Sequence, residues 1–379
     1  MKMKHGVWTV ALVTLVGLTG CSQNAAGQSK QAAQSTSNHA SVKASGNSTG
    51  TNGVKTTQAN AGSSTIQGST NSTAAKVPKG PLPGDLLIAD EGNSRILIVN
   101  PQKKVVWSMN LGFKGNTKAG ADDSFLTPDQ KHIIINEENN QVIAIIDIAK
   151  KKIVWQYGHP GHPGSKPGYL NTPDDAYQLP NGDVSVADIR NQRILFINPK
   201  TNKIVKQYGI TGKRYHNPPY SFAAPNGDTP VSGGRTLVTE IGGSYADMLS
   251  PSGKLLYTVH FPNIKYPSDT QLLPNGNLLV VDYSKPGRVE EITPKGKIVW
   301  DYYKTSGNGA LNHPSLAIRL PNGDIALNDD YDDRVVIINP KTNKIVWQYG
   351  HKGKSGTAKG FLNEPDGIDF VPTTVNLGN

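Results

Sequence analysis

Acidic residues recur at equivalent places in the 379-residue chain, directly after a position that is usually proline. The residue pairs at these places are Asp122 and Asp123, Asp174 and Asp175, Pro219 and Tyr220, Ser268 and Asp269, Ser315 and Leu316, and Asp366 and Gly367. Carboxylates and carbonyls that converge on one point suit a hard cation such as Ca²⁺ or Mg²⁺ better than a softer metal. The candidate ligands of such a cation are Asp123, Asp175, Asp269 and Asp366. The alternative is that these side chains accept backbone N–H bonds at strand ends.

Histidines form a second set that could do chemistry, because five of the seven beyond residue 79 fall between one repeat and the next. Two or three histidines that converge with a carboxylate would bind a transition metal. The candidate metal ligands are His159, His162 and His351. The candidate catalytic residues are His313, His216, Arg214 and Glu240. The alternative is that the histidines are solvated loop residues.

An aspartate followed five residues later by an arginine also recurs. The pairs are Asp90 and Arg95, Asp188 and Arg193, Asp329 and Arg334, and, with one extra residue, Asp282 and Arg288. In the second repeat both partners change together, to Asn136 and Gln141, as expected where an unpartnered buried charge would be costly. Repetition favours architecture over catalysis, so we expect structural ion pairs between strands. The tryptophans that end four repeats, Trp107, Trp155, Trp300 and Trp347, are likewise expected to pack between blades.

The repeat that positions these residues is marked by Pro-Asn-Gly turns. These begin at Pro180, Pro225, Pro274 and Pro321, with weaker versions at Pro128 and Pro83. A second proline precedes the turns, at Pro173, Pro218, Pro267 and Pro314, and recurs at Pro365, with spacings of 45, 49, 47 and 51 residues. Periods of this length are typical of propeller blades.

Each repeat offers four short strands, such as 183–188, 193–198 and 203–209 with the strand before the turn. We therefore predict an all-β, six-bladed β-propeller with four-stranded antiparallel blades over residues 80–379. The first repeat lacks its own inner strand, whereas residues 364–372 have the pattern of one with no blade after it. The prediction is that this C-terminal inner strand closes the ring and removes exposed edges.

The fourth repeat departs from the others. It starts at Pro218-Pro219, it is interpreted as carrying an insertion at 229–234, and it has neither the Asp–Arg pair nor the Trp. Function tends to break symmetry in a repeat protein. Tyr215, His216, Tyr220 and Glu240 are therefore of interest, and ordinary drift of one blade is the alternative.

Several of these motifs resemble known repeat families. The runs 90–96, 188–194 and 329–335, with their Asp, Asn and Arg residues, resemble NHL repeats over the whole propeller. The run Asn339-Pro340-Lys341-Thr342-Asn343-Lys344-Ile345-Val346-Trp347 is more loosely similar to quinoprotein-type repeats, which usually have Asp first and Gly after the Thr. Quinoprotein dehydrogenases generally have eight blades, so six repeats argue against a bound pyrroloquinoline quinone.

These resemblances imply different activities. Lactone-hydrolysing six-bladed propellers use a calcium ion, and peptide-amidating lyases that resemble NHL propellers bind a transition metal. Arylsulfotransferase-like propellers, which the chain resembles weakly in Trp-Gln-Tyr-Gly and Leu-Pro-Asn-Gly, use His and Arg around the channel. The residues nearest to that pattern are His313, Arg319 and Arg214.

The N-terminal region has the features of an export signal and a tether. Lys2 and Lys4 precede fifteen uncharged and mostly apolar residues, 6–20, which end in Leu18-Thr19-Gly20-Cys21. This ending resembles the lipobox of bacterial lipoproteins, which implies cleavage and lipidation at Cys21, the only cysteine. Residues 22–79 lack acids and aromatics and are rich in Ser, Thr, Asn and Gly, which predicts a disordered tether. We expect a protein anchored by lipid on the outer face of a membrane.

Composition excludes several classes of protein. One cysteine leaves no disulfide scaffold and no Cys-based zinc site. The net charge is +10, but residues 1–79 hold seven Lys and no acid, so 32 basic and 29 acidic residues remain and we expect no nucleic-acid partner. No Ser–His–Asp signature, phosphate loop or Cys nucleophile is present.

The leading expectation is an extracytoplasmic binding or scaffold module, monomeric, with a protein, cell-envelope or small-molecule ligand. The alternative is an enzyme at the mouth of the central channel, either a metal-dependent hydrolase or lyase or an arylsulfotransferase-like transferase. Whether the protein is an enzyme stays open at this point, and the expected cofactor, if any, is Ca²⁺ or another divalent metal.

Overall fold

The computed structural model describes residues 80–112 and 120–378. The predicted signal peptide, the predicted lipidation site Cys21 and the predicted tether lie outside these residues. Within the described ranges, no helix is both long enough and apolar enough to cross a membrane.

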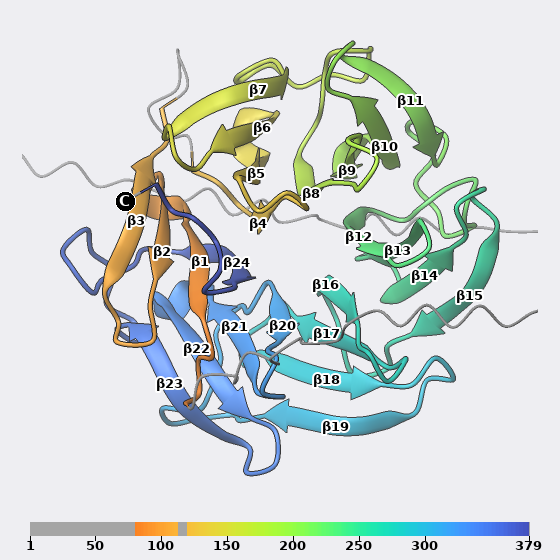
Figure 1. The fold of residues 1–379 in the computed structure, drawn as a ribbon. Coiled ribbons are helices and arrows are strands. Elements are labelled where there is room, and N and C mark those ends of the chain that lie inside the picture. The colour runs from red at the N-terminus through yellow and green to blue at the C-terminus, as the bar shows by residue number, and fades with distance from the viewer. Residues whose placement is uncertain (1–79, 113–119, 379) are drawn as a thin grey trace, which may run out of the picture. The chain divides into compact units, whose positions relative to one another are not determined.

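Six four-stranded antiparallel sheets follow one another around a ring, as predicted (Figure 1). The first blade contains β24 (Pro365–Val371), β1 (Asp85–Asp90), β2 (Arg95–Val99) and β3 (Val105–Asn110). The second contains β4 (Ser124–Leu126), β5 (His132–Glu137), β6 (Val142–Asp147) and β7 (Lys152–Gly158), and the third β8 (Pro173–Gln178), β9 (Val184–Asp188), β10 (Arg193–Asn198) and β11 (Lys203–Tyr208). The fourth contains β12 (Pro225–Val231), β13 (Arg235–Glu240), β14 (Tyr245–Leu249) and β15 (Leu255–His260). The fifth contains β16 (Pro267–Leu272), β17 (Leu278–Asp282), β18 (Arg288–Ile292) and β19 (Ile298–Tyr303), and the sixth β20 (Ala317–Arg319), β21 (Ile325–Asp329), β22 (Arg334–Asn339) and β23 (Lys344–Gly350). Short 3-10 helices join the second and third strands of four blades: η1 (Glu91–Asn93), η2 (Glu138–Asn140), η3 (Ile189–Asn191) and η4 (Asp330–Asp332).

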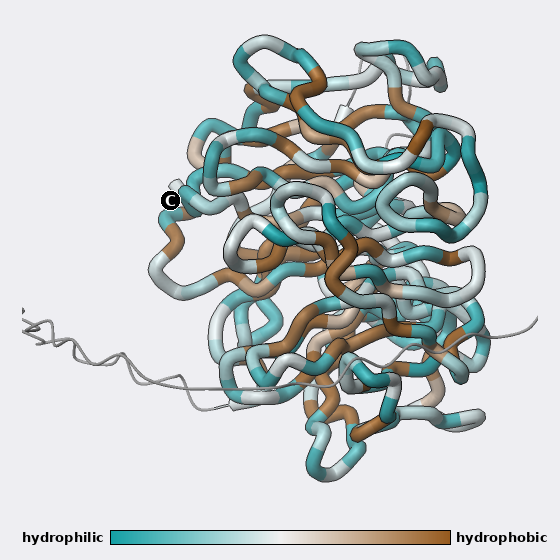
Figure 2. Tube along the Cα trace, turned by 90° about the vertical axis from the view of Figure 1, so that its right-hand side faces the viewer, coloured by the Kyte–Doolittle hydropathy of each residue, from teal (hydrophilic) through white to brown (hydrophobic). Residues whose placement is uncertain are grey.

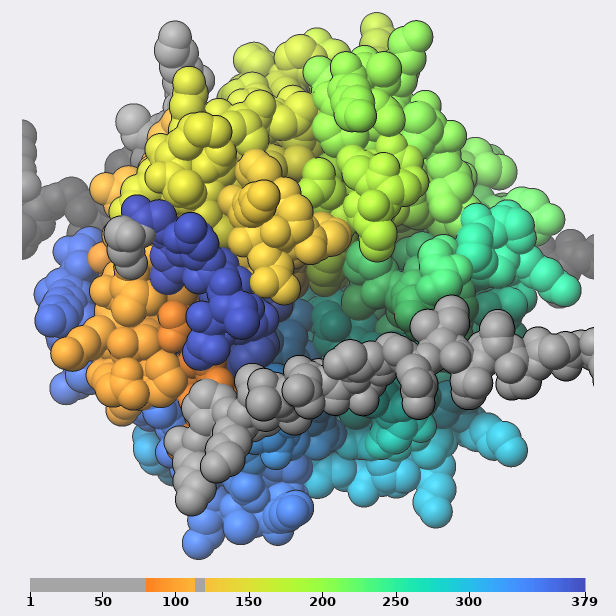
Figure 3. Space-filling view, viewed as in Figure 1, coloured from red at the N-terminus to blue at the C-terminus, as the bar shows by residue number. Residues whose placement is uncertain are grey.

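The ring is closed by the C-terminal strand. β24 pairs antiparallel with β1, with Ile88 opposite Ile368 and Asp85 opposite Val371. In Figure 3 the dark-blue C-terminal segment lies against the orange first blade. The predicted closure is confirmed, because the C-terminal strand β24 supplies the inner strand that the first blade lacks.

The core lies between neighbouring blades. One apolar cluster, for example, joins Ile96 and Ile98 of the first blade to Ile133 and Val142 of the second. In Figure 2 brown, hydrophobic stretches of the chain run through the body of the propeller, and many of the loops at its edge are teal. The middle strands are buried on both faces, which explains why their β-branched runs are nearly continuous in the sequence.

The tryptophans of the outer strands link four of the blades to the blade that follows. Their indole N–H groups donate to carbonyl or amide oxygens of the following blade, at Ile148 (2.9 Å from Trp107), Asn202 (2.7 Å from Trp155), Asn343 (2.7 Å from Trp300) and Pro101 (3.2 Å from Trp347). The last of these bonds runs from the sixth blade to the first. These residues therefore act in packing between blades, as predicted.

Three of the expected Asp–Arg pairs join the second strand of a blade to the third. The Nε–Oδ2 distances are 2.6 Å for Arg95 and Asp90, 2.7 Å for Arg193 and Asp188, and 2.8 Å for Arg334 and Asp329. All three aspartates are fully buried.

The fourth expected pair does not form. Arg288 lies 3.3 Å from Asp301 and 3.5 Å from Glu290, whereas Asp282 accepts the backbone amides of Lys265 and Tyr266. The extra residue between Asp282 and Arg288 changes the connection, which here contains no 3-10 helix. The prediction of an Asp282–Arg288 ion pair was therefore wrong.

In the second blade the predicted pair, Asn136 and Gln141, is one residue out of register with the structure. Glu137, not Asn136, ends β5 at the place of the buried aspartates, and Val142 stands opposite it in place of the arginine. Without a guanidinium, burial raises the pKa of Glu137 to about 8. Asn136 instead donates toward the carboxylates of Asp122 (3.2 Å) and Asp174 (3.4 Å).

The fourth blade also differs from its prediction. Pro225-Asn226-Gly227 is not a turn but begins the inner strand β12, and the turn that follows is 232–234. Residues 229–234 are thus no insertion, and the extra chain precedes Pro225. The positions equivalent to the acidic pairs are Asn226 and Gly227, not Pro219 and Tyr220.

Candidate functional site

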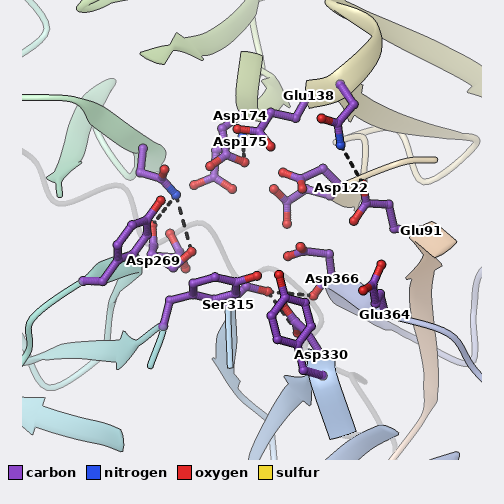
Figure 4. A pocket seen from close by; sticks show the side chains of 17 residues that line it. Glu91, Asp122, Glu138, Asp174, Asp175, Asp269, Ser315, Asp330, Glu364 and Asp366 are labelled. Atoms are coloured by element: carbon purple, nitrogen blue, oxygen red, sulfur yellow. Dashed lines mark hydrogen bonds between the residues drawn. The ribbon is translucent and has the colours of Figure 1, made fainter. Parts of the chain in front are cut away.

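A cavity of about 250 Å³ opens where the inner strands meet, and acidic side chains dominate its lining. Its carboxylates are Glu91, Asp122, Asp123, Glu138, Asp174, Asp175, Asp269, Asp330, Glu364 and Asp366. The labelled carboxylates in Figure 4 surround one common space and come from different blades. Among the described residues, no Lys, Arg or His lines this cavity. We call it the acidic mouth.

The first residues of the inner strands supply many of these carboxylates. Adjacent residues of a regular strand point to opposite faces, so two consecutive aspartates would not normally share a cavity. The pairing of β8 with β9 shifts register between Asp174 and Ala176, and Asp175 has a φ of 37°. Such a bulge redirects side chains, which explains how Asp174 and Asp175 both line the mouth.

A second position adds to the mouth in four of the blades. Glu91, Glu138, Tyr283 and Asp330 each follow directly after the last residue of their blade's second strand. Three of them begin the 3-10 helices η1, η2 and η4. Sequence reasoning missed this position. Comparison of the repeats residue by residue at the strand end would have found it.

The electrostatics of the mouth favour protonation or a bound cation. Burial, followed by the like charges nearby, raises the pKa of Asp122, Asp174, Asp175 and Asp366 well above the ordinary value. Burial raises the pKa of Asp269 to about 6, and burial with the charge of Glu138 raises that of Glu91 to about 7. Crowded carboxylates that are buried from water cannot all ionise without compensation.

The donor set fits a hard cation. Oxygens of Asp122, Asp123 and Asp174 lie within 4.8 Å of one another, and so do those of Glu91, Asp122 and Asp366. Asp175 Oδ2 and Asp330 Oδ2 are buried without a hydrogen-bond partner. An all-oxygen set of carboxylates matches Ca²⁺ or Mg²⁺ rather than Zn²⁺ or Cu²⁺.

One wall of the mouth is aromatic. Tyr266, Tyr283 and Tyr331 line it, with ring centroids 5.5 Å apart for the first pair and 6.1 Å apart for the second. His313 packs behind this wall, 4.9 Å from Tyr283 and 4.7 Å from Tyr331. Burial and the charge of Lys285 lower the pKa of His313, which favours the neutral imidazole.

The structure places the predicted site residues in different parts of the propeller. The four predicted cation ligands, Asp123, Asp175, Asp269 and Asp366, all line the acidic mouth. His216 and Glu240 lie together elsewhere in the fourth blade, with Nδ1 and Oε1 2.9 Å apart.

The remaining candidates do not line the mouth. His159, His162, His351 and Arg214 are exposed. The rings of His159 and His351 pack on Tyr169 and Phe361 within their own loops. Arg319 bonds Glu291 at 2.5 Å and the carbonyl of Gly323. The arrangement expected for an arylsulfotransferase-like site, with His313, Arg319 and Arg214 together, is therefore absent from the described residues.

Comparison with known proteins supports a propeller built of repeats. The family model described as outer membrane protein assembly factor BamB matches residues 221–367, less than half of the chain. No curated protein matches the chain.

Solved structures with a similar fold share little sequence with it. A protein of unknown function from Bacteroides caccae is 21% identical, with 75% of this chain and 97% of that chain covered and a TM-score of 0.55. Selenomethionine-substituted virginiamycin B lyase from Staphylococcus aureus is 18% identical, with coverage of 78% and 90% and a TM-score of 0.50. A streptogramin B lyase structure is 17% identical, with coverage of 76% and 88% and a TM-score of 0.50. These likenesses show the fold alone.

Proposed function

We propose that this protein is an extracytoplasmic binding module whose acidic mouth holds a hard divalent cation, with Ca²⁺ the best fit, and binds an oxygen-rich ligand through it. The observation that carries the proposal is the ring of ten carboxylates, which no Lys, Arg or His offsets among the described lining residues. The predicted export signal and the partial match to an outer membrane assembly factor support a place outside the cytoplasm.

The cation would change the electrostatic balance of the mouth. Buried like charges cost free energy unless they are protonated or paired. A Ca²⁺ ion takes six to eight oxygens at about 2.3–2.6 Å and readily keeps water or ligand oxygens among them. A ligand with carboxylate, hydroxyl or carbonyl oxygens could thus complete the coordination, and its apolar part would face the tyrosine wall.

Calcium is expected to bind and stabilise the described propeller. At a free concentration about a hundred times the Kd, binding contributes about 2.7 kcal/mol, which raises the Tm of a domain of this size by about 4 °C. Calorimetric titration with Ca²⁺ and melting curves in Ca²⁺ and in EDTA measure both effects. Asp122→Asn should weaken binding most, because Asp122 belongs to both oxygen clusters.

Asp183→Asn is the matched control, because Asp183 lies in the β8–β9 turn outside the mouth and bonds Asn181 and Asn198. This variant should bind Ca²⁺ like the unmodified protein. Absence of Ca²⁺ or Mg²⁺ binding, or equal binding by Asp122→Asn, would rule out the proposal.

A second candidate function is metal-assisted hydrolysis or elimination, which the position of His313 favours. The imidazole of His313 contacts Tyr283 and Tyr331 of the tyrosine wall but does not line the cavity, so a ligand polarised by the cation would have to extend past these rings to give it a proton. Turnover of aryl esters, lactones and aryl sulfates with Ca²⁺ present would show it, and His313→Gln should lower the rate by about 10²- to 10⁴-fold. If these substrates are not turned over, or His313→Gln has no effect, this candidate fails and the binding proposal is unaffected.

A further inference from the structure

The fourth blade replaces the recurrent ion pair by a different cluster. In the third blade Asp188 faces Arg193 across β9 and β10, whereas in the fourth Glu240 faces Tyr245 across β13 and β14. His216 reaches Glu240 from the long connection that precedes β12. A second buried carboxylate, Asp247 of β14, lies near the same nitrogen of the imidazole. Neither acid has an arginine partner here.

Three ligand atoms face one point. His216 Nδ1 lies 2.9 Å from Glu240 Oε1 and 3.8 Å from Asp247 Oδ2, and one ligand atom from each of the three residues lies within 4.8 Å of the other two. Ligand atoms about 2.0–2.2 Å from a tetrahedral ion are separated by similar distances. The cluster therefore has the dimensions of a small metal site.

Neighbouring groups hold the ligands in place. Thr258 Oγ1 donates to Asp247 Oδ1 at 2.6 Å, and the amide of Ala223 donates to Glu240 Oε2. The ring of Tyr245 stacks on His216 with centroids 4.0 Å apart and planes 17° apart. Such outer contacts are the usual means by which metal ligands are oriented.

An unpartnered buried oxygen points to a missing ligand. Asp247 is fully buried, and its Oδ2 has no hydrogen-bond partner. A protonated His216 would offset only one negative charge, so the second carboxylate needs either a proton or a cation. A divalent ion would balance both carboxylates and accept the neutral imidazole as its third ligand.

We propose that His216, Glu240 and Asp247 form a second metal site, for a divalent transition ion of the Zn²⁺ type. One imidazole and two carboxylates suit such an ion, unlike the all-oxygen set of the acidic mouth. The His216 side chain is 27% exposed while both acids are buried. The open coordination position thus lies on the side of the histidine, where water or a small ligand can enter. This site does not depend on the proposed function of the mouth.

Binding of Co²⁺, as a spectroscopic substitute for Zn²⁺, tests the site in the full-length protein with excess Ca²⁺ to occupy the mouth. We expect one bound Co²⁺ with visible absorption of a four-coordinate ion, displaced by Zn²⁺. His216→Ala should weaken binding by more than about 100-fold, beyond the 10–100-fold cost of losing an outer contact. Asp247→Asn keeps the shape of the side chain and should also abolish the tight site.

The matched control is His132→Ala, because His132 forms a similar pair with Asp129, 2.9 Å away, but at an exposed turn where the described residues offer no third ligand. This variant and Asp122→Asn should keep the Co²⁺ spectrum. Melting curves of each variant establish that it is folded. The proposal is overturned if the unmodified protein gives no four-coordinate spectrum, if folded Asp247→Asn binds Co²⁺ unchanged, or if Asp122→Asn rather than His216→Ala removes the ion.

Discussion

Between about pH 5 and about pH 8, the calcium-free propeller should lose about 4 kcal/mol of unfolding free energy through Asp269 and Glu91. In the folded state the pKa of Asp269 is raised from 3.8 to about 6 and that of Glu91 from 4.5 to about 7. The folded protein therefore binds more protons than the unfolded chain across this interval, and its stability falls as the pH rises. Each pKa unit corresponds to about 1.4 kcal/mol.

Urea unfolding in EDTA at several pH values measures this loss, and the same series with saturating Ca²⁺ should show a much smaller one, because the ion offsets the charges that appear. Glu91→Gln removes the group with the higher of these two pKa values and should flatten the EDTA series. Asp183→Asn, outside the mouth, should leave it unchanged. Stability in EDTA that is constant or rises with pH would contradict the account of the mouth given above.

Replacement of Arg334 by alanine should lower the free energy of unfolding by about 3–5 kcal/mol. This is the largest effect that we expect from replacing one arginine of the propeller. Arg334 and Asp329 are both fully buried, and Asp329 already has its pKa raised by burial to about 6 in spite of the guanidinium. Arg334 also donates to the carbonyls of Asn308 and Ala310. Its loss leaves the buried carboxylate of Asp329 without its ion-pair partner and removes the donor to both carbonyls. Denaturant unfolding at neutral pH gives the difference directly.

Two controls separate the charge from the packing. Arg235→Ala removes an arginine whose bond to the carbonyl of Ser232 is exposed, and it should change the stability by less than about 0.5 kcal/mol. The double variant Asp329→Asn with Arg334→Met removes both charges and should recover part of the loss. If Arg334→Ala costs no more than Arg235→Ala, the buried pair is not a structural element of the blade.

The architecture was predictable because its signals repeat. Turn residues and β-branched runs recur in every repeat, so an error in one blade does not change the prediction of a propeller. The strand pattern at residues 364–372, which has no blade after it, predicted how the ring closes. The four predicted cation ligands were found for the same reason, since equivalent positions of a closed ring must face the same axis.

The wrong assignments within single blades arose where the same residue types occur at two different structural positions. Pro225-Asn226-Gly227 has the composition of a turn, yet its proline occupies the start of an inner strand, as Pro173 and Pro267 do. The register error at Asn136 arose because two adjacent polar residues have different roles. The amide of Asn136 donates to Asp122 of the mouth, whereas Glu137 occupies the strand-end position of the buried aspartates. Asp247 left one usable signal, an acid in the middle of an apolar strand, but the loop that brings His216 to it has no repeat counterpart from which its path could be inferred.

The pairing of β24 with β1 also has a consequence for the order of folding. Blades two to six each draw their strands from one continuous stretch and can form from local contacts, whereas the first blade needs Ile88 to meet Ile368 from the far end of the chain. Loop closure over such a distance is slow and entropically costly. During synthesis or export, β1 therefore remains without its partner until the last repeat has emerged. Ring closure should then be the final kinetic step, and a chain stalled before residue 365 would present an edge on which other chains can aggregate.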